Sequence, residues 1–436
     1  MFKRVSKPKN KCALSRNNST ITNDVVRTTL VLGLACGFAV QADEGHEVEH
    51  LIEHEAGSVQ VEGGLTWFLQ NTSGAVEDTS ALSYTLDLGL EAPVGKHGKA
   101  VVALEAGDGE GVDPAIGSLS GVNYDAFYTE LTNTVGGSTN VVVPSISQAF
   151  YEGEYMAGDL ITSIGKLDVH SMYDDNAYAN DETDQFLSAI FTRSPDTSYK
   201  QLDYYYAPGV AVKYVLSEML EATLILANGN DSGFNDVFNN MYSVGQINLK
   251  PGFGGREGNY RFYAINDGRN SDNTTFTKIS NGQTIDNSSW GLSFDQALPG
   301  GVGVFARYST QDDGVVENTV ESSWSLGALF EGSSWGREHD TIGVGYGSVN
   351  LNTAPAARAA YNAGDDGAVG VNPDTSINDD LGITNFDDET HLELFYKFGY
   401  GHLFSLTADL QIIENSGGNA DADTVTVTGF RGQLNF

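Results

Sequence analysis

The sequence predicts an all-β protein, a transmembrane antiparallel up-and-down β-barrel of about 16 strands. Three observations favour this fold. From residue 58 onward, apolar and polar residues alternate in short segments, each about as long as one tilted strand that crosses a bilayer. The connections between segments alternate between long polar stretches and tight turns. The chain also has no apolar run long enough to cross a bilayer as a helix.

Residues 1–42 have the pattern of a signal peptide. A long basic start precedes an apolar segment at 28–40, and Ala42 is the expected last residue before cleavage. Both cysteines lie in this segment, so the exported protein is expected to have neither a disulfide nor a thiol nucleophile. Without residues 1–42 the formal charge changes from -35 to -41, because they hold seven basic residues and one acidic residue. This acid excess argues against nucleic acid as a partner and against an anion channel.

Residues 43–57 follow, and we expect them to form a solvated periplasmic segment. His46, His50 and His54 recur in it at four-residue spacing. On a helix these imidazoles would share one face and could hold a divalent metal, which is the alternative interpretation.

The strands are read from the alternation, because successive side chains of a strand point to opposite faces. In residues 82–91, for example, Leu86 and Leu88 share one face, and Thr85 and Asp87 share the other. The same rule divides the barrel segment, residues 58–436, into sixteen strands: 59–70, 82–91, 97–107, 145–156, 160–167, 208–216, 220–228, 241–249, 258–266, 289–297, 301–310, 321–330, 339–348, 391–399, 403–413 and 424–436.

The connections have a regular parity. Long stretches such as 108–144 and 168–207 alternate with short turns such as 92–96 and 157–159. Long loops at one rim and tight turns at the other are typical of barrels in the outer membrane of Gram-negative cells. An even strand count then puts both termini on the periplasmic side, and a barrel of this size leaves an aqueous bore.

The last predicted strand, 424–436, ends the chain on an aromatic residue. Phe430, Leu434 and Phe436 fall on one face, which suits lipid, while Arg431 and Gln433 fall on the other, which suits water. Such a closing strand is typical of the signal that the barrel-assembly machinery reads.

Parity along the strands also predicts which charged side chains face the bore. Pointing inward avoids a cost of a few kcal/mol for a charge at the lipid midplane. The alternative is that these charges only pair with one another across the inner wall. The basic candidates are Lys213, Arg261, Arg307, Lys397 and Arg431, and the acidic candidates are Glu62, Asp87, Glu91, Glu105, Glu152, Glu154, Glu221, Asp295, Glu393 and Asp409.

The third long loop, 168–207, differs from the others in composition. Asn180 or Asp181 could cap a short helix that runs through Phe191, and Pro195 would end it. Its apolar residues, among them Phe186, need burial, so we expect the loop to fold inward against the wall and narrow the bore. The alternative is a surface helix that packs on neighbouring loops.

Six sequence blocks lie in collinear order over most of residues 58–436: 165–187, 228–238, 258–267, 288–309, 323–347 and 390–413. Together they resemble the OprB-type carbohydrate-selective porins. The resemblance implies a sixteen-stranded outer-membrane channel that passes sugars by diffusion. The sugar-contacting arginines of that family are matched through Arg261 in NYR and Arg307 in FARY.

The leading hypothesis is therefore a passive outer-membrane porin for mono- and oligosaccharides. A sugar in a narrow bore exchanges water for charged or amide side chains, with aromatic rings against its apolar faces. The expected pore-lining residues are Arg261, Arg307, Glu152, Asp295, Glu393, Arg431 and Tyr263, and the expected constriction residues of the third loop are Asp181, Glu182 and Phe186.

Two other functions stay open from the sequence. The charge of -41 favours a less selective, cation-preferring diffusion porin. A closed-barrel adhesin or receptor scaffold is the second, although the many inward Ser, Thr and Gly residues favour an unfilled bore. An enzyme is not expected, because no inward Ser and His pair is evident and His391 reads as interfacial.

The expected partners are carbohydrate solutes, outer-membrane lipids and lipopolysaccharide, and the barrel forms either a single channel or a homotrimer. No cofactor is expected. Weak Ca²⁺ sites in the loops are the exception considered, because Asn228, Asn230 and Ser232 precede Gly233 with the spacing that begins a calcium loop. The glutamate expected at its twelfth position is replaced by Asn239.

Overall fold

The computed structural model describes residues 59–109, 111–128, 145–195, 206–229, 240–268, 270–271, 274–363 and 381–436. The chain divides into two units, Met1–Glu55 and Ala56–Phe436, and all described residues belong to the second. The expected signal peptide, the 43–57 segment with its three histidines, and the Ca²⁺ candidates Asn230, Ser232 and Gly233 lie outside the described residues.

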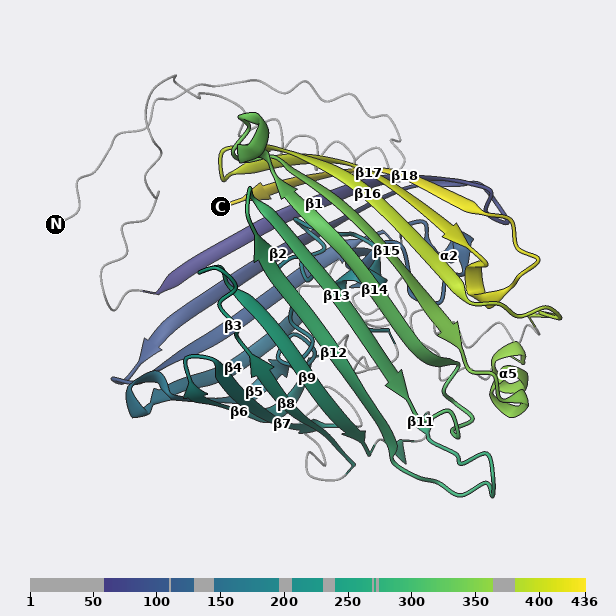
Figure 1. Cartoon of the computed structure of the whole chain (residues 1–436), viewed down its shortest axis with the longest axis horizontal. Coiled ribbons are helices and arrows are strands. Elements are labelled where there is room, and N and C mark those ends of the chain that lie inside the picture. The colour runs from purple at the N-terminus through teal and green to yellow at the C-terminus, as the bar shows by residue number, and fades with distance from the viewer. Residues whose placement is uncertain are drawn as a thin grey trace, which may run out of the picture. The chain divides into compact units, whose positions relative to one another are not determined.

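Sixteen of the described strands form one closed antiparallel barrel (Figure 1). Each predicted strand agrees with an observed one to within three residues at either end. The barrel strands are β1 (Gln60–Ser73), β2 (Ser80–Val94), β3 (Gly98–Asp108), β4 (Ser145–Tyr155), β5 (Leu160–Asp168), β6 (Tyr206–Ser217), β7 (Leu220–Asn228), β8 (Met241–Leu249), β9 (Gly258–Asp267), β12 (Asn287–Leu298), β13 (Val302–Gln311), β14 (Val320–Glu331), β15 (Thr341–Leu351), β16 (Glu389–Tyr400), β17 (Phe404–Glu414) and β18 (Val425–Asn435).

The remaining elements are short and lie in the connections. A small hairpin, β10 (Asn270–Ser271) and β11 (Thr274–Thr275), stands apart from the barrel sheet. No helix among the described residues is long and apolar enough to cross a membrane. The helical elements are α2 (Asp113–Ile116), η1 (Tyr124–Tyr128), η3 (Met156–Gly158), α4 (Ala189–Thr192), η4 (Gly332–Trp335), α5 (Pro355–Asn362) and η5 (Ser416–Gly418).

The barrel closes where the last strand meets the first. β18 pairs antiparallel with β1, with Arg431 opposite Phe68. The terminal residue continues the ladder, because Gly63 N donates to Phe436 O at 2.8 Å and Phe436 N donates to Gly63 O at 2.9 Å. Gly432 is needed for space, since a Cβ there would collide with the indole of Trp67 on the facing strand.

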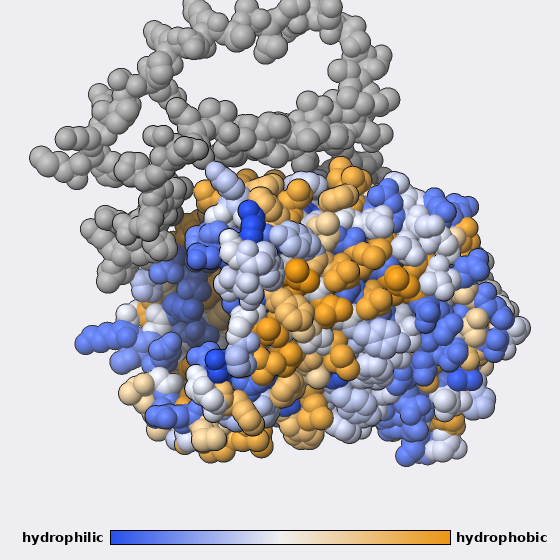
Figure 2. Space-filling model, turned by 45° about the horizontal axis from the view of Figure 1, so that its top comes forward, coloured by the Kyte–Doolittle hydropathy of each residue, from blue (hydrophilic) through white to orange (hydrophobic). Residues whose placement is uncertain are grey.

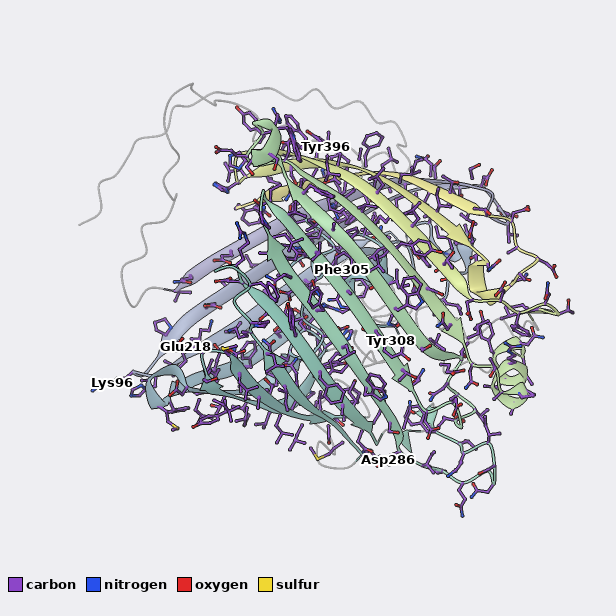
Figure 3. All side chains as sticks on the ribbon, in the orientation of Figure 1. Lys96, Glu218, Asp286, Phe305, Tyr308 and Tyr396 are labelled. Atoms are coloured by element: carbon purple, nitrogen blue, oxygen red, sulfur yellow. The ribbon has the colours of Figure 1, made fainter. Side chains whose placement is uncertain are left out.

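The outer wall carries the apolar side chains that the alternation predicts. Leu224, Ile247 and Phe262 are about half exposed, at 51%, 50% and 46%. Hydrophobic residues gather on the visible outer wall (Figure 2). The tight turns and the long connections lie at opposite ends of the strands: Lys96 and Glu218 mark turns at one end, and Asp286 marks a long connection at the other (Figure 3).

The buried core sits inside the barrel, between its inner wall and two inward-folded loops. One apolar cluster contains Phe186, Phe191, Phe305 and Phe395, and a second surrounds Tyr173. A third joins the β3–β4 connection to β17 and β18. The bore is therefore partly filled, and the loops that fill it set its shape.

Candidate functional site

The connection between β5 and β6 lies inside the barrel, and its described residues, 169–195, are called the constriction loop below. Its hydrogen bonds reach inner-wall residues of β8, β9, β12, β13, β16 and β18. In the order around the barrel, β8 to β18 spans nine of the sixteen strands. The loop therefore runs along more than half of the inner wall, and its expected inward fold is confirmed.

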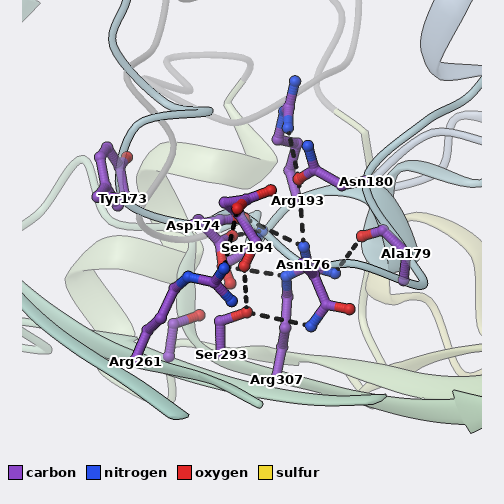
Figure 4. A network of polar contacts seen from close by, with 12 residues as sticks. Tyr173, Asp174, Asn176, Ala179, Asn180, Arg193, Ser194, Arg261, Ser293 and Arg307 are labelled. Atoms are coloured by element: carbon purple, nitrogen blue, oxygen red, sulfur yellow. Dashed lines mark hydrogen bonds and ion pairs between the residues drawn. The ribbon is translucent and has the colours of Figure 1, made fainter. Parts of the chain in front are cut away.

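Arg307, on the inner face of β13, binds two separate passes of the constriction loop (Figure 4). Its Nε donates to Asp174 Oδ1 at 3.0 Å. One Nη1 bond goes to Ala179 O at 2.6 Å and another to Phe191 O at 2.5 Å. Nη2 donates to Asp174 O at 3.1 Å and to Asn180 Oδ1 at 3.4 Å. These five bonds use all five donors of a guanidinium, so Arg307 has none left for a solute.

Arg261, on β9, lies between a wall carboxylate and a loop carboxylate. Its Nη1 donates to Asp295 Oδ2 on β12 at 2.7 Å, and its Nη2 donates to Asp175 Oδ2 at 2.9 Å. Asp295 is 2% exposed, whereas the side chain of Asp175 is 50% exposed. Tyr263 on the same strand is buried, and its hydroxyl donates to Ser194 Oγ at 3.1 Å. These inward charges thus pair with the wall and the loop, which was the alternative left open by the sequence.

Arg431 and Lys397 hold the middle of the constriction loop from the opposite side of the barrel. Arg431 Nη1 donates to Glu182 O at 2.5 Å, and Nη2 donates to Gln185 O at 2.8 Å. Lys397 Nζ donates to Asp184 Oδ2 at 2.6 Å. The wall thus binds the carbonyls of Glu182 and Gln185 and the carboxylate of Asp184. Residues 182–185 of the loop therefore have a defined position inside the barrel.

The apolar side of the loop packs on a part of the wall that has no side chains. Phe186, Ile190 and Phe191 are all buried. They lie over Gly345 and Gly347 on the inner face of β15, where an added Cβ would come within 3.0 Å of their side-chain carbons. The sequence suggested that inward Gly residues leave the bore unfilled, but Gly345 and Gly347 do not do so. They make room for the rings of the loop.

The helix expected through Phe191 is much shorter than predicted. Only α4, Ala189–Thr192, is α-helical in this stretch. Asp181 does not cap it, because its Oδ1 accepts the N–H groups of Thr183 at 2.9 Å and Asp184 at 3.1 Å and forms a local turn instead. Asp side chains compete with helical hydrogen bonds in this way.

The β3–β4 connection also folds inward, which the sequence did not predict. Its described inward part, residues 111–128, is called the second loop below. Val112, Ile116 and Val122 pack in an apolar cluster against β17 and β18. The two loops bind each other, since Tyr124 N donates to Leu187 O at 3.0 Å. No regular period marks the apolar residues of the second loop, so the alternation rule could not find it.

Two glutamates on β16 accept backbone N–H groups from these loops. Glu393 accepts from Leu187 at 2.7 Å and from Ser188 at 2.9 Å. Glu389 accepts from Leu119 at 3.0 and 2.9 Å. Both carboxyl groups are fully buried, and each binds backbone N–H groups that would otherwise be buried without a partner. β16 therefore anchors both loops.

His391 lies between the two glutamates, and its interpretation as an interfacial residue is wrong. It is 1% exposed, and its Nε2 lies 2.8 Å from Glu389 Oε1. Its Nδ1 lies 3.1 Å from Ser188 Oγ of the constriction loop, and Ser120 Oγ of the second loop lies 3.1 Å from Nε2. An inward Ser and His pair does exist, then, but it is buried behind both loops and joins them to the wall.

Most of the expected pore-lining residues are covered by the constriction loop, which corrects their predicted role. The covered side chains point inward as expected, but none is more than 8% exposed: Arg261, Arg307, Asp295, Glu393, Arg431 and Tyr263. Phe186 likewise packs against the wall rather than facing the bore. Glu152 is half-buried and stays available, as do Asp181 and Glu182 of the loop.

The open side of the bore is formed by β1 to β7 and the free face of the constriction loop. Figure 2 shows a recess whose visible wall is mainly hydrophilic. Lys99 there is paired with Glu91 at 3.0 Å and lies 3.7 Å from Glu152. The charged inner-face residues of these strands that are exposed or half-buried are Glu62, Asp87, Glu91, Lys99, Glu105, Glu152, Glu154, Lys213 and Glu221.

Loop carboxyls differ in how easily they ionise. Burial opposes ionisation of Asp174, but Arg307 and the hydrogen bonds to it hold its pKa well below the usual range. Burial raises the pKa of Glu182 to about 8; Asp125 and Asp181 add to this shift, and Arg193 opposes it. Burial also raises the pKa of Asp113 to about 7, against the N–H bonds from Val122 and Asn123. The fold thus favours the charged form of Asp174 and shifts Glu182 and Asp113 toward their protonated forms.

Residues 120–436 match the model of the family described as "Carbohydrate-selective porin, OprB family". The chain belongs to this family. The resemblance stated from the sequence is confirmed, and the matched range includes the constriction loop and both glutamates of β16. Comparison with curated proteins gave no match. Family and fold are those of outer-membrane channel proteins.

Solved structures show the same fold. The high-pH structure of Pseudomonas putida OprB is 18% identical, with a TM-score of 0.68 over 87% of this chain and 94% of that chain. The low-pH structure of the same porin is 13% identical, with a TM-score of 0.51 over 87% and 93%. The outer-membrane channel DcaP of Acinetobacter baumannii is 11% identical, with a TM-score of 0.50 over 88% and 99%.

Proposed function

We propose that this outer-membrane porin passes carbohydrates by passive diffusion through the space between the constriction loop and strands β1 to β7. The observation that carries the proposal is the loop itself. Its hydrogen bonds reach six strands within a run of nine, while the charged inner-face residues of β1 to β7 stay exposed or half-buried. Family membership supports the solute class. Loss of the loop would leave a wide, unselective bore.

In this proposal the arginines act as positioning residues. Arg261, Arg307 and Arg431 fix the loop, and the groups that a sugar meets come from the open side. Glu152 and Glu182 can accept hydrogen bonds from sugar hydroxyls there. These bonds replace those that the sugar gives up to water, and they must stay weak for the solute to leave.

The test is liposome swelling with purified protein, using glucose, maltose and a larger oligosaccharide. Sugar influx that falls steeply with sugar size is expected, because the loop limits the passage. Deleting residues 176–192 should raise single-channel conductance in planar bilayers and weaken this size dependence. Wild-type liposomes that do not swell in glucose would refute the proposal.

A second candidate function is a cation-preferring diffusion porin. One observation favours it: the exposed or half-buried inner-face charges that the structure describes on β1 to β7 are seven carboxylates and two lysines. The reversal potential in a KCl gradient decides between the two, provided that sugar influx is measured on the same preparation. A strong K⁺ preference without sugar influx would favour this candidate.

A further inference from the structure

The three inward arginines are covered by the constriction loop, which leaves few charged donors for a solute. Arg261, Arg307 and Arg431 are at most 8% exposed. Among the described inner-face residues of β1 to β7, the cations are Lys99 and Lys213, and both are half-buried. Charged donors on the open side of the bore therefore come from these two lysines.

Lys99 lies between two carboxylates of neighbouring strands, near the tight-turn ends of β2, β3 and β4. Its Nζ donates to Glu91 Oε1 at 3.0 Å and to Glu91 Oε2 at 3.1 Å, and it lies 3.7 Å from Glu152 Oε1. The side chains of Lys99, Glu91 and Glu152 are 39%, 40% and 26% exposed. These three residues are called the charged triad below. Lys99 was not among the inward cations predicted from the sequence.

The longer contact of the charged triad leaves room for a hydroxyl group. The 3.7 Å between Lys99 Nζ and Glu152 Oε1 exceeds the length of a direct hydrogen bond. An ammonium group only donates and a carboxylate only accepts, so a hydroxyl between them accepts from one and donates to the other. Ser163, the cross-strand partner of Glu152 on β5, donates its Oγ to Glu152 Oε2 at 3.4 Å and supports that carboxylate from the other side.

An aromatic ring adjoins the charged triad on the same inner face. Phe150 precedes Glu152 by two residues on β4 and is half-buried. Its cross-strand partner is Gly165, which pairs in turn with Gly209 on β6, so these two positions add no side chain beside the ring. Phe150 also packs on the apolar cluster around Tyr173, which fixes its position. The ring therefore borders a stretch of bare backbone on the inner wall.

The ring and the triad are spaced like the two kinds of surface on a sugar. Residues two apart on a strand share one face and lie about 7 Å apart, which is comparable with the width of a hexopyranose and its hydroxyls. Small-molecule sites commonly combine an aromatic surface with a few placed polar groups. A sugar whose apolar face lies on Phe150 thus has hydroxyls within reach of Lys99 and Glu152.

We propose that Phe150 and the charged triad form a subsite at which the passage binds one hexopyranose unit. The inference rests on the proposed function and names a binding site within it. Glu91 and Lys99 precede residue 120, where the family match begins, so that match does not include them. Glucitol, an open-chain polyol, has similar hydroxyls but no rigid apolar ring face, so the subsite prefers glucose to glucitol.

Single variants test the two halves of the subsite. F150L removes the aromatic ring and keeps an apolar side chain, and F150Y is the conservative variant that keeps the ring. K99M removes the ammonium group. Its matched control is K213M, because Lys213 is also a half-buried inward lysine and the change in net charge is equal. Heat-modifiable mobility on gels verifies that each variant is folded.

Titration of glucose against the single-channel ion current in planar bilayers gives the glucose concentration for half-maximal block. F150L should raise this concentration about two- to tenfold, which is the worth of one aromatic contact, and F150Y should restore it. K99M should raise it about tenfold, because a hydrogen bond from a charged donor is lost, whereas K213M should match the wild type. Glucitol should block the wild type less than glucose does, and F150L should abolish this difference.

Half-maximal glucose concentrations that are the same in F150L and K99M as in the wild type would overturn the inference, as would equal changes in K99M and K213M. Equal block of the wild type by glucose and glucitol would overturn it too. Wild-type liposomes that do not swell in glucose would instead overturn the proposed function. The two failures are distinguishable, because swelling measures passage and block measures binding.

Discussion

Replacement of Arg307 by alanine should release the constriction loop without unfolding the barrel. The change removes five hydrogen bonds to the loop and leaves the fully buried Asp174 without its cationic partner. Removing one partner of a buried ion pair costs about 3–5 kcal/mol. We expect the change to weaken the docking of the loop and not the pairing of the strands, because the backbone hydrogen bonds of β13 with β12 and β14 do not involve the guanidinium.

Single-channel recording in planar bilayers is the assay. R307A should give a higher and noisier conductance than the wild type, while the heat-modifiable mobility of the folded barrel on gels is kept. R307K is the matched variant: it keeps the charge but has three donors, so its conductance should lie between the two. The double variant R307A/D174N should recover part of the loss, since the unpaired carboxylate is gone. An R307A channel with wild-type conductance and noise would refute this account of the loop.

Three further predictions follow from the loops and the barrel closure. In the folded protein the pKa values of Glu182 and Asp113 are raised to about 8 and 7, so loop docking should be strongest in acid, weaken as pH rises from about 4 toward 8, and level off above that. The noise of the single-channel current, recorded at several pH values, measures this change. D113N should reduce the rise of that noise with pH. G345A should displace Phe186 and Phe191 and raise conductance, whereas G245A, with open space around its Cβ, should not. Deletion of Phe436 removes its ladder bonds with Gly63 and should lower the amount of heat-modifiable barrel in the outer membrane.

The strands could be predicted because a two-residue period and a loop–turn parity are local properties of the sequence. The inward constriction loop could be predicted because Phe186 and its apolar neighbours had to be buried somewhere. The partners of Arg307 could not be, because they are mainly backbone carbonyls, which no side-chain pattern reveals. The burial of His391 could not be predicted for a similar reason, because only the fold shows that two loops cover it.

The hydrogen bonds between the two loops and β16 affect the order in which the barrel can assemble. Leu187 and Leu119 are bound by Glu393 and Glu389, which are more than 200 residues later in the chain. These anchoring bonds of both loops can form only once β16 is in place, and β16 is among the last strands to be made. The inner surface of the barrel therefore takes its final shape only when the sheet is nearly complete, because the residues that anchor both loops lie on one of its last strands.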